Sequence, residues 1–98
     1  MDNKIVVTKR FRNNTRSVYQ YLLKEFSQKI AYRFLDQLEQ RIKLIVQHPT
    51  IGKPSSNKIN IRSISLTPLN RLFYRYCNNT SEILCLFDMR RDPKMTLY

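Results

Sequence analysis

The spacing of apolar residues changes at His48-Pro49, and this change constrains the fold more than any other feature of the chain. Before this point, apolar side chains recur at a helical spacing, at Ile30, Phe34, Leu38, Ile42 and Ile45. That spacing is typical of a helix with one buried face. Because the residue before a proline avoids the helical backbone conformation, the helix should end here. Beyond a turn-rich connector at residues 48–55 the apolar period becomes two, which indicates strands.

Two further elements precede this helix. Residues 5–7 form a β-branched run that predicts a short first strand. Thr8 suits the N-cap of a helix over residues 9–26, and Ser27 suits the N-cap of the next helix. We therefore expect a helical hairpin that spans roughly residues 9–47.

Three strands follow the connector. Alternation predicts them over residues 59–67, 69–77 and 83–89, and residues 78–81 should join the last two as a hairpin loop. The element order indicates an α+β fold, in which the helical hairpin packs on one face of a mainly antiparallel sheet of three to four strands. Residues 1–98 are expected to form one such domain. So short a chain should leave the other face of the sheet open to a partner.

The charge of the chain points to a class of partner. Lysine and arginine total 18 and the acids total 7, so the formal net charge is +11. A field of this sign favours polyanions such as nucleic acid or an acidic peptide. No apolar run approaches the ~18 residues of a membrane-spanning helix, and no signal peptide is recognisable. We therefore expect a cytoplasmic protein without a membrane partner.

The composition excludes several kinds of active site. Gly52 is the only glycine, whereas phosphate-binding loops need several. His48 is the only histidine, and its place at a helix end suits a cation favoured by the helix dipole better than a catalytic base. The seven acids show no spacing suited to Mg²⁺, and Cys77 and Cys85 lack the neighbours of a zinc site. We expect no metal, no cofactor, and two reduced structural cysteines.

The penultimate strand carries the main candidate binding residues. Alternation places Leu72 and Tyr74 on one face, and Arg71, Phe73 and Arg75 on the other. Two arginines that flank an aromatic ring on an open sheet face form a surface suited to phosphate groups and bases. We therefore expect this face to bind the partner.

The strand before it is less regular. Arg62 shares its parity with Ile64 and Leu66, whereas Ile59 and Ile61 have the opposite parity. A phase slip is therefore expected near Arg62, at a bulge. Spacing alone leaves the face of Arg62 open.

The C-terminal stretch adds further cations. Because the last strand should end beside the start of the penultimate one, Arg90 and Arg91 are expected to lie near Arg71. Arg62 could join them from the neighbouring strand. The tail would then complete a basic cluster that the strands begin.

Several short motifs follow one another along nearly the whole chain. They are Tyr21-Leu22, Ala31 with Phe34, Pro49-Thr50-Ile51-Gly52, Asn60-Ile61-Arg62, Asn70-Arg71-Leu72-Phe73-Tyr74-Arg75 and Phe87-Asp88-Met89-Arg90-Arg91-Asp92-Pro93. In this order and spacing they resemble the RelE/ParE superfamily of bacterial toxins from type II toxin–antitoxin modules. The resemblance implies the same α+β fold.

The resemblance also implies two alternative activities. RelE-like members cut mRNA in the ribosomal A site without a metal, whereas ParE-like members bind DNA gyrase and poison it. Both are neutralised by an antitoxin that wraps the toxin, and the pair usually represses its own operon. The implied partners are therefore an acidic antitoxin and either the ribosome with its mRNA or DNA gyrase.

The implied site residues depend on the branch. If the chain is RelE-like, the catalytic candidates are Arg71, Arg90 and Tyr98, and Arg91 can take the place of Arg90. The binding candidates are Arg62, Phe73, Arg75, Arg91 and Lys94.

The two branches are matched by different features. The second lysine of the RelE-like basic strand is missing, since Ser63-Ile64-Ser65 follows Arg62. The helical hairpin, the Pro-x-x-Gly turn and the Arg-Arg-Asp-Pro ending match ParE-like members better, whereas the charge of +11 suits an RNA target. A metal-free endonuclease, a gyrase inhibitor, and an inactive homologue that serves only as antitoxin partner and co-repressor all stay open.

Overall fold

The computed structural model describes residues 3–90 and residue 98. Its elements are β1 (Lys4–Val7), α1 (Lys9–Glu25), α2 (Gln28–Gln47), β2 (Lys53–Pro54), β3 (Ile61–Thr67), β4 (Asn70–Cys77) and β5 (Thr80–Asp88). The strands form one sheet in the order β1-β5-β4-β3-β2, in which β1 runs parallel to β5 and the other neighbours are antiparallel. The α+β fold is confirmed, with one strand more than expected because part of the connector pairs with β3 as β2.

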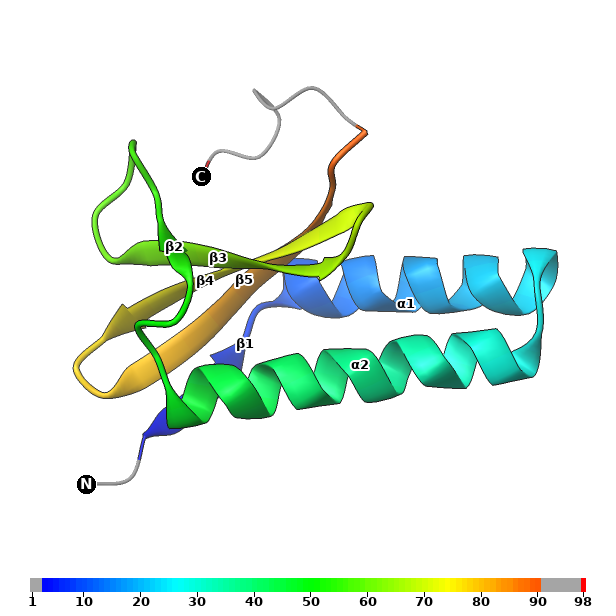
Figure 1. The fold of residues 1–98 in the computed structure, drawn as a ribbon, viewed down its shortest axis with the longest axis horizontal. Helices are drawn as coiled ribbons and strands as arrows, with labels where there is room; N and C mark the ends of the chain where they lie inside the picture. The colour runs from blue at the N-terminus through cyan, green and yellow to red at the C-terminus, as the bar shows by residue number, and fades with distance from the viewer. Residues whose placement is uncertain (1–2, 91–97) are drawn as a thin grey trace.

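Both helices begin where the N-cap residues predicted. Thr8 Oγ1 accepts a hydrogen bond from the backbone N–H of Phe11 (3.0 Å), and Ser27 Oγ accepts one from Ile30 (3.2 Å). Each bond satisfies an N–H group that a helix start otherwise leaves unpaired. α2 ends just ahead of the proline, at Gln47. The helical hairpin is therefore confirmed, and its far end extends beyond the sheet (Figure 1).

The core lies between the helical hairpin and one face of the sheet (Figure 1). Its buried side chains come from both helices and three strands: Phe11, Phe34, Leu38, Ile45, Leu66, Leu72, Tyr74, Ile83 and Leu86. Burying a large apolar side chain contributes about 1.5–3 kcal/mol, so these contacts fix the helices against the sheet.

Alternation along β4 assigns its two faces as expected. Leu72 and Tyr74 are fully buried in the core, so Arg71, Phe73 and Arg75 lie on the side away from the helices. We call that side of the sheet the helix-free face. By strand register its members include Lys53, Ile61, Ser63, Arg71, Phe73, Arg75, Glu82, Cys85 and Phe87.

β3 begins two residues later than the alternation indicated. Asn60 adopts a left-handed backbone conformation with φ of 63°, which interrupts the strand before Ile61. Ile59 is 87% exposed and contributes nothing to the core. The mixed parity in the sequence has two sources, because Ile59 precedes the strand and Ile61 is buried on the helix-free face.

The expectation of a bulge near Arg62 is wrong. β3 pairs regularly with β4 from Ile61 to Ser65, and its register shifts only between Ser65 and Thr67. A second shift falls on β5, where Leu84 is an extra residue between two paired neighbours.

The β4–β5 hairpin turns on two asparagines. Asn78 and Asn79 have φ of 52° and 58°, the left-handed region that asparagine tolerates and tight hairpin turns require. The loop is shorter than expected because β5 already begins at Thr80, and the strand ends at Asp88. No helix within the described residues is long and apolar enough to span a membrane.

Candidate functional site

On the helix-free face, the side chain of Arg71 is hydrogen-bonded to the neighbouring strand, β3. Its Nε donates a hydrogen bond to Oγ of Ser63 at 2.7 Å, and its Nη2 donates to the Ser63 carbonyl at 3.3 Å. Ser63 is buried, so these bonds hold the guanidinium in place. No acid within the described residues forms an ion pair with Arg71. The charge of Arg71 can therefore serve an anionic group of a partner.

Arg75 lies on the same face and has a weak partner. Its Nη1 lies 3.5 Å from Oε1 of Glu82, and both side chains are partly exposed. An ion pair of this kind is worth about 0–1 kcal/mol, so an anionic partner can displace Glu82 at little cost. Lys53, directly across from Ser63, adds an exposed cation at the edge of the face.

Aromatic rings cover the centre of the helix-free face. The Phe73 ring meets that of Phe87 edge-on, with centroids 6.5 Å apart, and lies 6.0 Å from the ring of Tyr98. The guanidinium carbon of Arg10 lies 5.8 Å from the Tyr98 centroid, within cation–π range. Ser55 Oγ donates to the backbone oxygen of Tyr98 at 2.8 Å. The expectation of a fully open face is therefore wrong, because the chain's own Tyr98 lies on it.

Cys85 lies beneath this aromatic cluster. It is buried and sits across from Phe73 in the sheet. Burial raises the pKa of the Cys85 thiol, and the nearby charge of Arg10 offsets only part of the increase. Because the thiolate is the nucleophilic form, Cys85 is suited to packing and not to catalysis.

Arg62 lies on the other side of the sheet, against the connector between α2 and β3. It is paired across from core-facing Tyr74, and its Nη1 donates to the carbonyl oxygens of Thr50 (3.1 Å) and Gly52 (2.9 Å). The expectation that Arg62 joins Arg71 in one cluster is therefore wrong. Its strand parity is that of the core-facing positions.

Tyr74 holds the same connector through its hydroxyl group. The hydroxyl donates to the Pro49 carbonyl at 2.6 Å and accepts from the Gly52 N–H at 3.0 Å. Burial raises the pKa of Tyr74, although the Gly52 hydrogen bond and the charge of Arg62 lower it in part. A Cβ atom at position 52 would lie 2.7 Å from the Tyr74 hydroxyl oxygen, which explains the glycine at this position.

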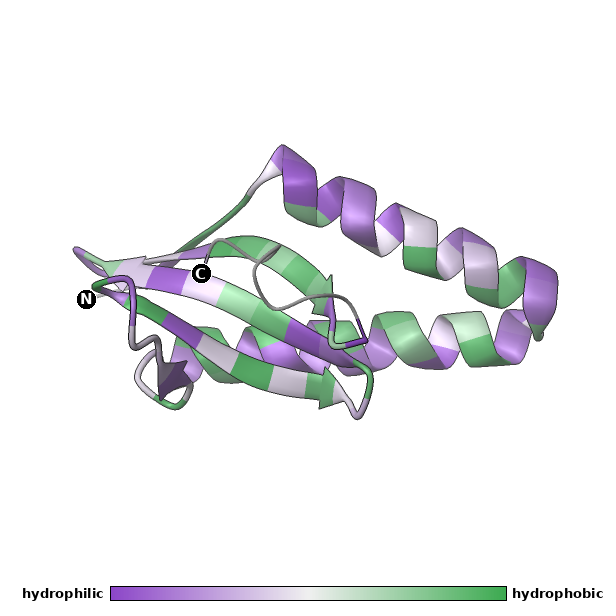
Figure 2. Ribbon diagram, turned by 90° about the horizontal axis from the view of Figure 1, so that it is seen from above, coloured by the Kyte–Doolittle hydropathy of each residue, from purple (hydrophilic) through white to green (hydrophobic). Residues whose placement is uncertain are grey.

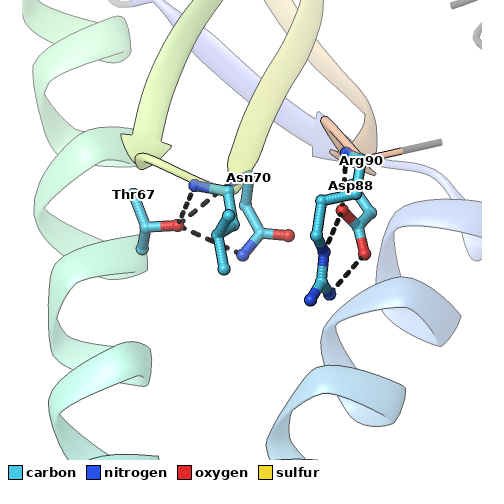
Figure 3. Close-up of polar contacts among 5 residues, drawn as sticks. Thr67, Asn70, Asp88 and Arg90 are labelled. Atoms are coloured by element: carbon cyan, nitrogen blue, oxygen red, sulfur yellow. Dashed lines mark hydrogen bonds and ion pairs between the residues drawn. The ribbon is translucent and has the colours of Figure 1, made fainter.

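Arg90 also lies away from the helix-free face. Its Nε and Nη2 donate to the two carboxylate oxygens of Asp88 at 3.0 and 2.7 Å, and these bonds raise the pKa of Arg90. Asp88 is across from Asn70 at a core-side position of the sheet, and Figure 3 shows the ion pair beside α1. The expected approach of Arg90 to Arg71 is therefore wrong.

The remaining basic candidates of the tail, Arg91 and Lys94, lie outside the described residues. Within the described part of the chain, no group of three or more histidine, cysteine or acidic side chains could hold a metal ion.

A groove of about 800 Å³ opens between the two helices and the end of the sheet. Its wall includes exposed apolar side chains of the helical hairpin, with Tyr21 55% and Phe26 59% exposed. Arg10, Arg33 and Arg90 also line it. The groove therefore combines an apolar surface with a cationic rim.

A tight turn borders this groove at the end of the sheet. Thr67 Oγ1 accepts hydrogen bonds from the backbone N–H groups of Leu69 and Asn70, both at 3.1 Å, and from the Asn70 side chain at 3.2 Å (Figure 3). Leu69 of this turn is 47% exposed and lines the groove together with Asp88 and Arg90.

The sequence matches the family described as the ParE toxin of the type II toxin–antitoxin system, parDE, over residues 5–93. The chain belongs to this family. No curated protein sequence matches it.

Solved structures show the same fold as this ParE-family chain. The structure described as the chromosomal ParDE toxin–antitoxin system from P. aeruginosa is 15% identical, with a TM-score of 0.76 over 88% of this chain and 95% of that one. The isolated E. coli RelE toxin is 11% identical, with a TM-score of 0.64 over 97% and 93%. The E. coli DinJ–YafQ toxin–antitoxin complex matches at 9% identity, with a TM-score of 0.65 over 92% and 96%.

Three side chains of the candidate site in this ParE-family chain were missed by sequence reasoning. Arg10 belongs to a helix, and it reaches Tyr98 only because the start of α1 lies beside β5. A hydrogen bond from Thr8 Oγ1 to the Leu84 carbonyl, at 2.7 Å, joins these two segments. Lys53 reaches the sheet because the connector pairs with β3. Ser63 gave no signal in the sequence, since it is paired with Phe73 and only the side chain of Arg71 reaches it diagonally across the sheet.

Proposed function

We propose that this ParE-family chain is the growth-inhibiting toxin of its module, and that the helix-free face contacts its target, DNA gyrase. The observation that carries the proposal is Arg71, held in place by Ser63 and without an acidic partner in the described part of the chain. Arg75 and the ring of Phe73 extend the same surface. A fixed cation beside an aromatic ring is typical of the residues that dominate protein interfaces.

Inhibition by binding fits the side chains of this face better than bond cleavage does. The described ionisable groups there are arginines, Lys53, Glu82, the buried Cys85 and Tyr98. Arginine does not deprotonate in proteins, and Glu82 is engaged by Arg75. None of these groups is a histidine, the side chain best suited to accept a proton near neutral pH.

A second function, metal-free cleavage of ribosome-bound mRNA, is favoured by the position of Tyr98. Its ring lies against Phe73 on the face that carries Arg71. An unstacked base could lie on such rings, and a guanidinium could stabilise the charge of a phosphorane. Tyr98 would then supply or accept the proton in the reaction.

We further propose that an acidic antitoxin segment occupies the groove between the helices. Two of the similar structures are described as toxin–antitoxin systems or complexes, ParDE and DinJ–YafQ. The groove supports the proposal because exposed Phe26 and Ile30 would bury apolar side chains of the segment, while Arg33 would pair with its acids. Charge steering to a chain of +11 would make the association fast and sensitive to salt.

The deciding experiment compares the two targets with one purified protein. DNA supercoiling by gyrase should be inhibited by the wild-type chain, and the Arg71→Ala/Arg75→Ala variant should need at least about tenfold more protein, since hot-spot truncations cost 2 kcal/mol or more. Lys24→Ala/Lys29→Ala, which removes the same charge from exposed positions, is the matched control and should inhibit normally. Normal gyrase activity at every toxin concentration would overturn the gyrase proposal.

Primer extension on an mRNA in a purified translation system tests the second function. Cuts that appear only with ribosomes would establish cleavage. Tyr98→Phe keeps the ring contact with Phe73 and removes the hydroxyl group, so it should abolish cleavage but leave gyrase inhibition unchanged. Full-length mRNA together with normal supercoiling would indicate an inactive homologue.

Co-expression with the protein encoded beside the toxin gene tests the groove. Ile30→Glu places a negative charge in the groove at a position that is 38% exposed, so the fold should persist while rescue from growth arrest is lost. Lys29→Glu, the neighbouring exposed position, is the control because it changes the charge more but does not line the groove. Rescue of Ile30→Glu to the wild-type level would place the antitoxin elsewhere.

A further inference from the structure

α1 carries an unusual charge distribution. From Lys9 to Lys24 it has five cations and no acid, and its first turn contains no acidic residue. α2 differs, because Glu39 pairs with Lys43 at 3.3 Å and Asp36 accepts a hydrogen bond from Gln40. The cations of α1 are therefore not balanced along their own helix.

The first turns of α1 are a costly place for these cations. The N-terminal end of a helix carries a partial positive charge, so acids stabilise it and cations destabilise it. Lys9 and Arg12 nevertheless stand in the first turn, and Arg16 follows one turn later. A local choice that opposes helix stability points to a function for these side chains.

Three of these five cations form one strip on the surface of α1. At 100° per residue, Lys9, Arg12 and Arg16 lie together on the side opposite Phe11, which is buried in the core. All three are exposed, and none forms an ion pair within the described part of the chain. Figure 2 shows the hydrophilic start of α1 along one side of the sheet. We call Lys9, Arg12, Asn13, Arg16 and Gln20 the α1 strip.

The side chains of the α1 strip indicate the kind of polyanion it fits. The strip has no aromatic residue on which an unpaired base could stack, which argues against single strands. Its three cations span about 10 Å along a straight, convex helix, at about 1.5 Å per residue. The major groove of B-form DNA admits a helix, whereas that of A-form RNA is too narrow. Amide side chains at Asn13 and Gln20 can donate to phosphate oxygens between the cations.

We propose that the α1 strip binds the phosphate backbone of double-stranded DNA without reading its sequence. The inference goes beyond the proposed function and does not depend on which target the toxin inhibits. It assigns the strip to a surface separate from Arg71 and Arg75, since those arginines lie on the sheet.

The test measures binding of the purified full chain to a fluorescent duplex of mixed sequence between about 50 and 200 mM salt. The strip variant is Lys9→Gln/Arg12→Gln/Arg16→Gln, and the control variant is Lys29→Gln/Lys43→Gln/Lys58→Gln, which lowers the net charge equally at exposed positions elsewhere. Each lost phosphate contact lowers the slope of log K against log salt by about 0.9. The strip variant should lose about 2–3 units of slope and the control less than about 1.

Two further readouts keep the result interpretable. The strip variant should unfold at the same or a higher temperature than the wild type, because it removes cations from the positive end of α1. Equal loss of slope in both triple variants would show a general charge effect and overturn the proposal. Loss of binding to duplex RNA with unchanged binding to duplex DNA would also overturn it and assign the strip to RNA.

Discussion

Replacing Gly52 by alanine should destabilise the fold, because the added methyl group has no room between Tyr74 and Arg62. The new Cβ atom would lie 2.7 Å from the hydroxyl oxygen of Tyr74, 2.9 Å from Tyr74 Cε1 and 2.9 Å from Arg62 Cβ. Real Cβ contacts are longer, so Tyr74 or the connector must move. The backbone angle at Gly52 is not left-handed, so the cost is steric.

The size of the effect follows from two terms. Overpacking a tight site costs about 1–3 kcal/mol. Moving Tyr74 also weakens its hydrogen bonds to Pro49 and Gly52, and leaving such groups unpaired costs about 1–3 kcal/mol. We therefore expect the free energy of unfolding to fall by about 2–5 kcal/mol, a large part of the ~5–15 kcal/mol typical of a small protein.

Urea unfolding measures this cost, and a double-mutant cycle identifies its origin. In a Tyr74→Phe background the closest contact, at 2.7 Å, no longer exists, so Gly52→Ala should cost about 1 kcal/mol less there than in the wild type. Ser56→Ala, at an exposed position between β2 and β3, should change stability by less than about 0.5 kcal/mol. A neutral Gly52→Ala, or equal costs in both backgrounds, would refute the reasoning.

Three further outcomes follow from the structure. Thr8→Ala removes an N-cap and a hydrogen bond to the Leu84 carbonyl, so thermal or urea unfolding should show a loss of about 1–2 kcal/mol, which Thr8→Ser should largely restore. A thiol reagent should label exposed Cys77 in the folded protein and reach buried Cys85 only after unfolding; fast labelling of both would contradict the burial of Cys85. Burial raises the pKa of folded Tyr74 above its unfolded value of 10.0, so its contribution to stability is complete below that pH and is lost as pH rises further. The free energy of unfolding of Tyr74→Phe should therefore fall less steeply at alkaline pH than that of the wild type, as measured by unfolding at a series of pH values.

Local rules were enough to predict the two helices. The N-caps at Thr8 and Ser27 and the proline that follows α2 act over three or four residues, so their effect does not depend on distant parts of the chain. The faces of β4 were predictable for the same reason, because alternate side chains of a strand point to opposite sides. Arg71 and Arg75 were therefore placed correctly together.

Long-range pairing decided the residues that sequence reasoning misplaced. Arg62 is drawn to the connector because the carbonyl groups of Thr50 and Gly52 need donors there. Arg90 turns to the carboxylate of Asp88, two residues before it, and so lies beside α1. The strand parity of Arg62 matches that of the core-facing positions of β3, so it could have indicated on which side of the sheet Arg62 lies. Its carbonyl acceptors, however, belong to a segment whose position is defined only by the fold.

By itself the sequence determined the order of the elements, the buried stripe of α2, the face of Arg71 and the basic character of the surface. Only the tertiary structure brought Arg10 and Tyr98 together over Phe73, paired Lys53 with β3 opposite Ser63, and opened a groove between the helical hairpin and the end of the sheet. The physical reason is the distance along the chain over which each interaction acts. Periodicity and capping act between near neighbours in the chain, whereas a binding surface is made of residues from distant segments, whose meeting depends on how the helices pack on the sheet.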